Sequence, residues 1–214
     1  MSLFNTFLFW LQIIFAVVFG VFQTNHMLMV STSGLSVSVF LCTEIFFAIN
    51  IYLSFSAYKQ HREKELFRTL LVYIAYFLMY GTFLVVLEVL TKGSWDGVDT
   101  QTMLFMLLFV SGALVYARIQ KLPFLDPVVK GLYSLGFKTI PQLMMAWKIV
   151  AVGGSGIGIV MLVIVHILTS IRLGQIWFHA MAMKRWDRNL IGLMLAEIGN
   201  EASWILVTIA WMMY

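Results

Sequence analysis

The sequence contains few charged residues, three prolines and a single cysteine. Only 11% of its 214 residues are Asp, Glu, Lys or Arg, against about 25% in a typical soluble domain. In contrast, 61% are hydrophobic, and the mean hydropathy is +0.92. So few charges cannot cover the surface of a soluble domain of this size, which excludes that class, a disordered chain and a fibrous protein. The composition predicts an all-α integral membrane protein.

The single cysteine, Cys42, excludes an intramolecular disulfide and a cysteine-based metal cluster. The net charge of +4 is small, and the basic residues fall in short loops rather than on one face. This distribution argues against nucleic-acid binding and indicates that the positive residues set the orientation in a bilayer. We expect neither a cofactor nor a metal ion.

Seven apolar runs approach the length of about 20 residues that a helix needs to cross a bilayer. The first run lacks a preceding basic segment and a small-residue cleavage site, so we expect a span rather than a removable signal peptide. The predicted domains are a first triplet at 1–91, a linker helix at 101–121 and a second triplet at 126–214. The seven runs are Leu3–Gln23, Leu35–Tyr58, Leu66–Leu90, Thr102–Arg118, Val128–Trp147, Gly156–Met181 and Leu190–Tyr214.

Ten of the fourteen Lys and Arg residues lie in three loops on one side of the predicted bundle. The positive-inside rule places these loops in the cytoplasm, with the N-terminus inside and the C-terminus outside the cell or inner membrane. The other side receives only Lys92, Lys138 and Lys148, and Arg172 falls within the sixth run. The ten residues are Lys59, Arg62, Lys64, Arg68, Arg118, Lys121, Lys130, Lys184, Arg185 and Arg188.

The two halves of the chain resemble each other at an offset of about 115 to 125 residues. Because an odd number of spans separates equivalent helices, the halves are predicted to run parallel as two triple-helix repeats. The matched segments are Phe22–Thr24 with Phe137–Thr139, Ser33–Ser36 with Gly153–Gly156, and Lys59–Arg68 with Lys184–Arg188.

The segment Gly136–Gln142, followed by Lys148 and the glycine cluster Gly153–Gly158, resembles the PQ-loop repeat. In that repeat a Pro-Gln pair ends one helix, and a Gly-Leu-Ser-like turn opens the next. The first half has such a turn at Ser31–Ser36, with Val21–Gln23 near the position of the Pro-Gln pair. The resemblance covers most of the chain in layout and about 40 residues in recognisable motif.

The resemblance implies the PQ-loop/SWEET-like group of membrane transporters, which carry sugars, amino acids or vitamins through seven helices in a 3+1+3 plan. In that group a proline in the first helix of a repeat acts as a hinge, which implies this role for Pro141 with Gln142. The solute binds at mid-membrane between the repeats, commonly beside an asparagine on the third helix of each repeat. Asn200 matches that position in the second half, and aligning Arg68 with Arg188 sets Tyr80 opposite it.

Polar side chains recur along one face of the seventh run, at helical spacing. An acidic group inside a bilayer costs a few kcal/mol, so it must face a cavity or a partner. Either Asn200 and Trp204 contact a solute while Glu197 or Glu201 binds a proton or cation, or the glutamates only pair with Arg172. The face consists of Glu197, Asn200, Glu201, Trp204, Thr208 and Trp211.

The third run has a matching stripe that includes Tyr76 and Tyr80. A tyrosine ring offers a flat apolar face with a hydroxyl at its tip, suited to a planar solute, although tyrosines also pack between helices. His166, central in the sixth run, is a candidate proton relay because histidine changes charge near neutral pH. Glu44 in the second run is another protonation candidate, with a hydrogen bond to a neighbouring helix as the alternative.

Enzymatic functions fit the sequence poorly. Ser155 lies in a motif similar to that of rhomboid proteases, but His166 would lie about 16 Å away along the helix. His166 and His179 point about 140° apart, which does not suit a haem, and the last run lacks the lysine of a rhodopsin.

The sequence therefore predicts a non-enzymatic small-solute transporter, proton-coupled or facilitative, whose partners are a solute and the lipid bilayer. The alternative is a non-transporting receptor or complex subunit on the same bundle. Small members of such families often form homodimers, and the sequence leaves the oligomeric state and the solute open.

Overall fold

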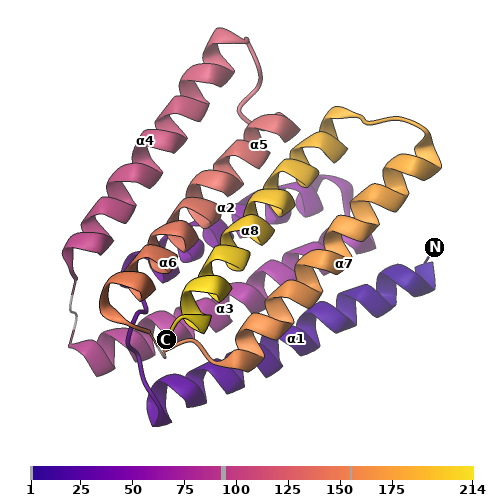
Figure 1. Ribbon diagram of the computed structural model, residues 1–214. Coiled ribbons are helices and arrows are strands. Elements are labelled where there is room, and N and C mark those ends of the chain that lie inside the picture. Colours follow the sequence, from indigo (N-terminus) through magenta and orange to yellow (C-terminus); the bar gives the residue numbers. More distant parts are fainter. Residues whose placement is uncertain (1, 93–94, 155) are drawn as a thin grey trace.

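The computed structural model describes residues 2–92, 95–154 and 156–214, with side chains from Thr6 onward, and it is a bundle of helices (Figure 1). Six of these helices are long and apolar enough to cross a membrane, so the chain is a multi-pass membrane protein. They are α1 (Ser2–Met29), α2 (Val37–His61), α3 (Lys64–Thr91), α4 (Gly97–Ile119), α7 (Ile159–Met183) and α8 (Arg188–Met212).

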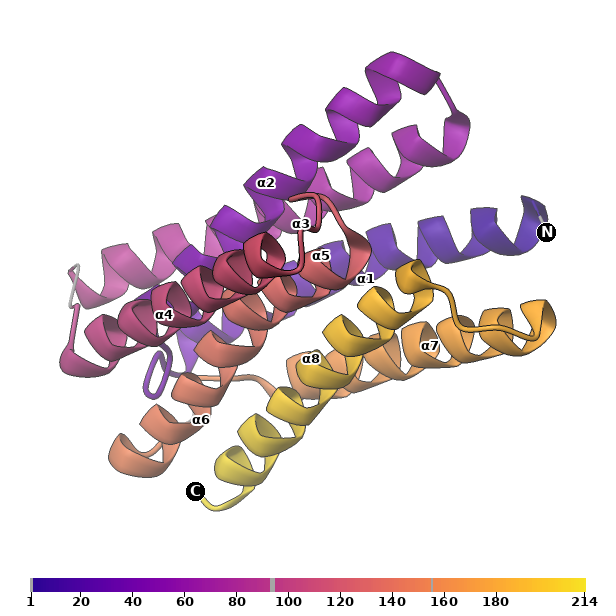
Figure 2. The same cartoon turned by 90° about the horizontal axis from the view of Figure 1, so that it is seen from above.

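The fifth apolar run forms three consecutive helical elements, α5 (Pro127–Ser134), the π-helix η1 (Leu135–Thr139) and α6 (Ile140–Val152). Pro141 explains the wider π turn, because proline lacks an N–H and its ring clashes with the carbonyl one turn earlier. The N–H of Ile140 instead bonds the carbonyl of Leu135, five residues back. The three elements continue as one helical path through the bundle (Figure 2).

In each half of the chain, the third helix packs against both of the others. Helix α3 contacts α1 and α2, and α8 contacts α7 and the α5–η1–α6 path. Helix α4 contacts α2 as well as α5, η1 and α6, so it touches both halves. A shared apolar core joins the halves, with Phe40 and Phe83 from the first and Met145, Ile149 and Val207 from the second.

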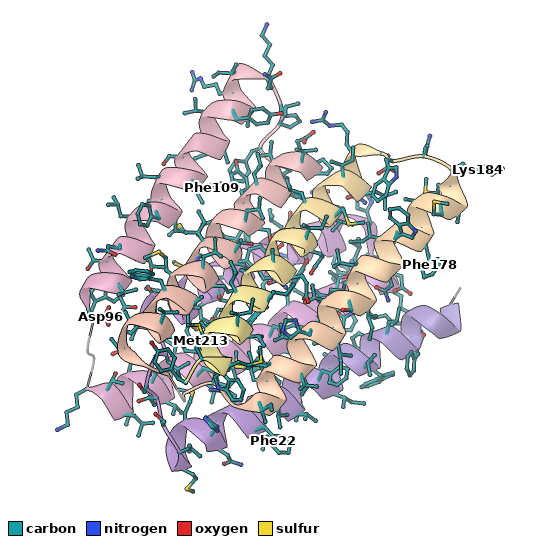
Figure 3. All side chains as sticks on the ribbon, viewed as in Figure 1. Phe22, Asp96, Phe109, Phe178, Lys184 and Met213 are labelled. Atoms are coloured by element: carbon teal, nitrogen blue, oxygen red, sulfur yellow. The ribbon has the colours of Figure 1, made fainter. Side chains whose placement is uncertain are left out.

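Large apolar side chains cover the outside of the bundle, as expected for a surface in contact with lipid tails. Phe22, Phe109 and Phe178, labelled in Figure 3, are among the many exposed ones. Charged and polar residues begin and end the helices instead. Asp96, Asp126 and Asp187 cap the N-termini of α4, α5 and α8 with side-chain hydrogen bonds, and Arg62, Lys92 and Lys184 end α2, α3 and α7 in the left-handed conformation.

The bundle has two distinct ends. We call the end with the loops at 59–68, 118–130 and 184–188 the basic end, where Lys184 lies in Figure 3. Asp96 and Met213 lie at the opposite end. At the basic end, Arg188 donates two hydrogen bonds of 3.0 Å to Asp126, which joins the start of α8 to the start of α5.

At the opposite end, buried polar groups join α4 to both halves. Lys148 of α6 lies 2.7 Å from Asp96 and 3.8 Å from Asp99. The fully buried Asp99 carboxylate accepts hydrogen bonds from the hydroxyls of Ser36 and Ser38 and from the Ser38 N–H. The three helices α2, α4 and α6 therefore meet at one ionic cluster.

The Asp96–Lys148 pair predicts a pH dependence of stability. Burial raises the pKa of Asp96, but hydrogen bonds from Lys148 and the Asp99 N–H, together with the Lys148 charge, outweigh it and hold the pKa below its usual value. A carboxylate whose pKa is lower in the folded than in the unfolded state stabilises the protein above pH about 4. This contribution is lost as the pH falls through the pKa of the folded state. We expect Asp96→Asn, which retains a capping oxygen, to cost about 0.5–1 kcal/mol at pH 7 and progressively less below pH 4.

Thermal melts in detergent between pH 3 and 8 check this prediction. Glu63→Gln, which changes an exposed carboxylate at the basic end, is the control. A difference between Asp96→Asn and the unmodified protein that stays constant over the whole pH range would contradict it.

Candidate functional site

A cavity of about 420 Å³ lies between the two halves of the chain. Its walls come from α2 and α3 on one side and from α5, η1, α7 and α8 on the other. It reaches Tyr80, Val165 and Trp204, each at least six residues inside its helix from the end opposite the basic end, and its mouth includes the exposed residues Lys130 and Asn189. The cavity therefore opens at the basic end and stops at mid-bundle.

All four residues predicted to contact a solute line this cavity: Tyr76, Tyr80, Asn200 and Trp204. The rings of Tyr76 and Tyr80 both stack on Phe47 of α2, and their centroids lie 5.5 and 5.6 Å, respectively, from the centroid of the Phe47 ring. The sequence analysis missed Phe47, because a phenylalanine in an apolar run carries no signal that separates cavity from core.

An amide network fixes the orientation of Asn200. Its Oδ1 accepts a hydrogen bond of 3.2 Å from Gln142, and its Nδ2 donates one of 3.2 Å to the Thr169 hydroxyl. Gln142 also accepts a hydrogen bond from Ser203. The glutamine of the Pro-Gln pair thus contacts the predicted solute site directly, one position after Pro141.

Arg172 and Glu197 form an ion pair of 3.1 Å in the wall of the cavity. Arg172 also donates a hydrogen bond of 3.3 Å to Gln12 of α1. The second carboxylate oxygen of Glu197 is buried and has no hydrogen-bond partner among the described residues. A second cavity of about 370 Å³, between α1, α3, α7 and α8, reaches the same pair. The charge pair therefore lies where two internal spaces meet.

The polar face of α8 is divided between two neighbours. Glu197, Asn200 and Trp204 line the cavity. Glu201 turns instead toward α7, where its carboxylate lies 2.7 Å from Nδ1 of His166. Nε2 of His166 lies 2.8 Å from the Thr208 hydroxyl. The polar face of α8 is therefore broad, with α7 along one edge and the cavity along the other.

Glu44 lies apart from the cavity. It is buried on α2 and faces Gly81 of α3, where a Cβ would lie 3.4 Å from its Oε1. That oxygen has no hydrogen-bond partner among the described residues. The buried Glu44 and the partly buried His166–Glu201 pair are therefore separate groups, and neither lines the solute cavity.

The sequence analysis assigned Lys138 to the side of the bundle opposite the basic loops, but the residue lies inside the bundle. It lies in η1 and lines the cavity, with its Nζ 5.5 Å from the centroid of the Phe46 ring. The helical path continues through Pro141 by means of the π turn, so the residues before the proline lie inside the bundle. Lys138 thereby adds a positive charge to the predicted site.

Hydrogen bonds between the halves close the space at the opposite end. Gln23 of α1 donates a hydrogen bond of 2.7 Å to the Gly156 carbonyl, and the Gly158 N–H donates one of 3.0 Å to the Gln23 side chain. The Ser33 hydroxyl donates a hydrogen bond of 3.0 Å to the Gly153 carbonyl, and the Ser33 carbonyl accepts one of 2.9 Å from the Gly156 N–H. We call this set of contacts the Gln23 closure.

Glycines allow the two loops of the Gln23 closure to touch. Gly34 has a φ of 78°, and a Cβ added to it would lie 2.9 Å from the Cα of Gly154. Ser155, the residue with the rhomboid-like motif, lies outside the described residues. Among the described residues, no group of three His, Cys, Asp or Glu side chains could hold a metal ion.

No family model, curated protein or solved structure matches the chain.

Proposed function

We propose that the protein is a small-solute membrane transporter that works by alternating access around the cavity between its halves. One observation carries this proposal: the cavity is open at the basic end and ends at mid-bundle, while the Gln23 closure joins the same two halves beyond it. A fixed pore would be open at both ends, and a purely structural subunit would need no cavity at this depth.

In this proposal the α5–η1–α6 path is the seventh span, and the chain forms two parallel triple-helix repeats joined by α4, on a PQ-loop/SWEET-like plan. The similar packing of α3 and α8 supports the repeat. So does a shared local pattern: Gln23 lies eleven residues before Gly34, and Gln142 lies eleven residues before Gly153, and both glycines have positive φ. The positive-inside rule then puts the basic end and the N-terminus in the cytoplasm.

The solute enters from the basic end and contacts Tyr76, Tyr80, Asn200 and Trp204. The halves then rock so that the basic end closes and the Gln23 closure opens, with η1 and Pro141 as the hinge. The closure consists of a few hydrogen bonds, each with a net value of about 1 kcal/mol. An energy difference of a few kcal/mol leaves the minor conformation populated enough to be reached in each cycle.

Proton coupling, where it occurs, involves a buried glutamate. Glu44, Glu197 and Glu201 each have a buried carboxylate oxygen without a hydrogen-bond partner among the described residues, and such an oxygen can carry a proton. Glu197 is the strongest candidate because it lines the cavity, where its protonation would release Arg172 beside the bound solute. His166 acts as a relay beside Glu201.

Uptake into proteoliposomes tests the proposal with labelled sugars, amino acids, nucleosides, small vitamins and aromatic acids. We expect saturable uptake of one class, reduced about tenfold or more in Asn200→Ala because that change leaves Gln142 and Thr169 without their buried partner. Gln120→Ala, which removes an exposed amide, is the control and should leave uptake unchanged. A folded protein that takes up none of these solutes, or uptake that is unchanged in Asn200→Ala, would favour the receptor or subunit alternative.

A further inference from the structure

We infer that the cavity binds a planar aromatic monoanion, with its ring against the first half of the chain and its carboxylate at Lys138. This inference names the solute class and rests on the proposed function of the cavity. It follows from how charges and rings are distributed between the two walls.

The cavity carries an excess of positive charge. Its charged lining residues are Lys130, Lys138, Arg172 and Glu197. Arg172 and Glu197 neutralise each other, and Lys130 lies at the exposed mouth. No carboxylate forms an ion pair with Lys138 in the part of the chain that the structure describes, although Lys138 lies in the middle of a helical path. Glu197 also acts on Lys138 electrostatically, but one carboxylate cannot balance two cations, so these three side chains leave one excess positive charge inside the cavity. Excess charge at this depth is costly, and one bound anion would neutralise it.

The opposite wall consists of stacked rings. We call Phe46, Phe47, Tyr76 and Tyr80 the aromatic wall. Phe47 and Tyr76 are nearly parallel, with 9° between their planes. Phe46 packs against Phe47 edge to face at 5.4 Å, and it is also the ring beside the Lys138 ammonium. The cation and the wall therefore adjoin each other, so a single small molecule can contact both.

Shape and charge together exclude other common solutes. A volume of about 420 Å³ is in the range of small-molecule sites and is ample for one ring with a short acidic side chain. A neutral sugar would leave the excess positive charge of the cavity in place. A zwitterionic amino acid adds no net charge, so it would also leave the cavity with its excess positive charge.

Equilibrium binding to the purified protein in detergent tests the inference without requiring transport. Phenylacetate has both features, phenylacetamide lacks the charge, cyclohexylacetate lacks the planar ring, and phenylalanine adds an ammonium. We expect phenylacetate to bind at least tenfold more tightly than phenylacetamide and more tightly than the other two. Tighter binding of phenylalanine or phenylacetamide, or no binding of phenylacetate to folded protein, would overturn the inference.

Variants of Lys138 link the effect to this residue. Lys138→Met should weaken phenylacetate binding about tenfold or more and leave phenylacetamide binding within about twofold, while Lys138→Arg should retain phenylacetate binding. Lys59→Met, which removes an exposed charge at the basic end, is the matched control. Equal phenylacetate binding by Lys138→Met and Lys59→Met would also overturn the inference.

The two proposals fail in different ways. Asn200-dependent uptake of another solute, without phenylacetate binding, would overturn the inference and leave transport standing. Lys138-dependent phenylacetate binding without any uptake would support the inference and contradict transport.

Discussion

Replacing Glu197 with glutamine should reduce solute transport about a hundredfold and also destabilise the protein. The change removes the only carboxylate that pairs with Arg172 among the described residues, while the arginine stays charged. The Arg172 and Glu197 side chains are 32% and 12% exposed, so removing one partner costs about 1–3 kcal/mol, less than in a fully buried pair, because the remaining charge has lost its compensation. Arg172 is then free to hold the anionic group of a solute too tightly for release into either compartment.

The double variant Arg172→Gln/Glu197→Gln separates stability from transport. It removes both charges, so we expect most of the thermal stability to return while uptake stays low. Melting curves and proteoliposome uptake of the two variants, measured side by side, check the prediction. Full uptake by Glu197→Gln would show that the pair only joins α7 to α8.

Replacing Gly192 with alanine should prevent correct packing of α5 against α8. A Cβ at Gly192 would lie 2.1 Å from the carbonyl oxygen of Pro127, and one at Gly131 would lie 2.6 Å from the carbonyl oxygen of Gly192. These contacts are with backbone atoms, which cannot rotate away as a side chain can. Small residues commonly allow such close approach between membrane helices. We expect a loss of about 3 kcal/mol or more.

Gly174→Ala is the control for this prediction, because a Cβ at that position on α7 meets nothing within 4 Å. It should leave the melting temperature unchanged or raise it slightly, since alanine favours a helix over glycine. The two variants are compared by size-exclusion chromatography and thermal melts in detergent. Equal stability of Gly192→Ala and Gly174→Ala would mean that α5 and α8 do not touch through their backbones.

Hydropathy predicted seven apolar spans, and six of them are confirmed as helices long and apolar enough to cross a membrane, since a lipid-facing helix needs a long run without charge. It was less accurate at their ends. The first run was expected to stop at Gln23, whereas α1 continues to Met29. Gln23 is buried inside the bundle by its hydrogen bonds to the 156–158 loop, and a partner 133 residues away leaves no local trace in the sequence.

Helical spacing placed Asn200 and Trp204 on one face, and the repeat alignment pointed to Tyr80 across from them, which suffices to assemble part of the cavity. The same reasoning could not locate Phe47 or Lys138. An aromatic residue in an apolar run is equally compatible with core and cavity, and a lysine near a proline is equally compatible with the end of a span and with its interior. Only the packing of α2 against α3, and the π turn before Pro141, decide these two cases.

The direct test of alternating access is the labelling of a cavity residue from each side of the membrane. Val165→Cys, in a chain whose buried native thiol is removed by Cys42→Ala, places a small thiol at the inner limit of the cavity. The charged reagent 2-sulfonatoethyl methanethiosulfonate is applied to right-side-out and inside-out vesicles. We predict fast labelling from the cytoplasmic face and slower labelling from the other face, which Gln23→Ala accelerates. Labelling from one face only, in both the single-cysteine protein and its Gln23→Ala variant, would contradict alternating access.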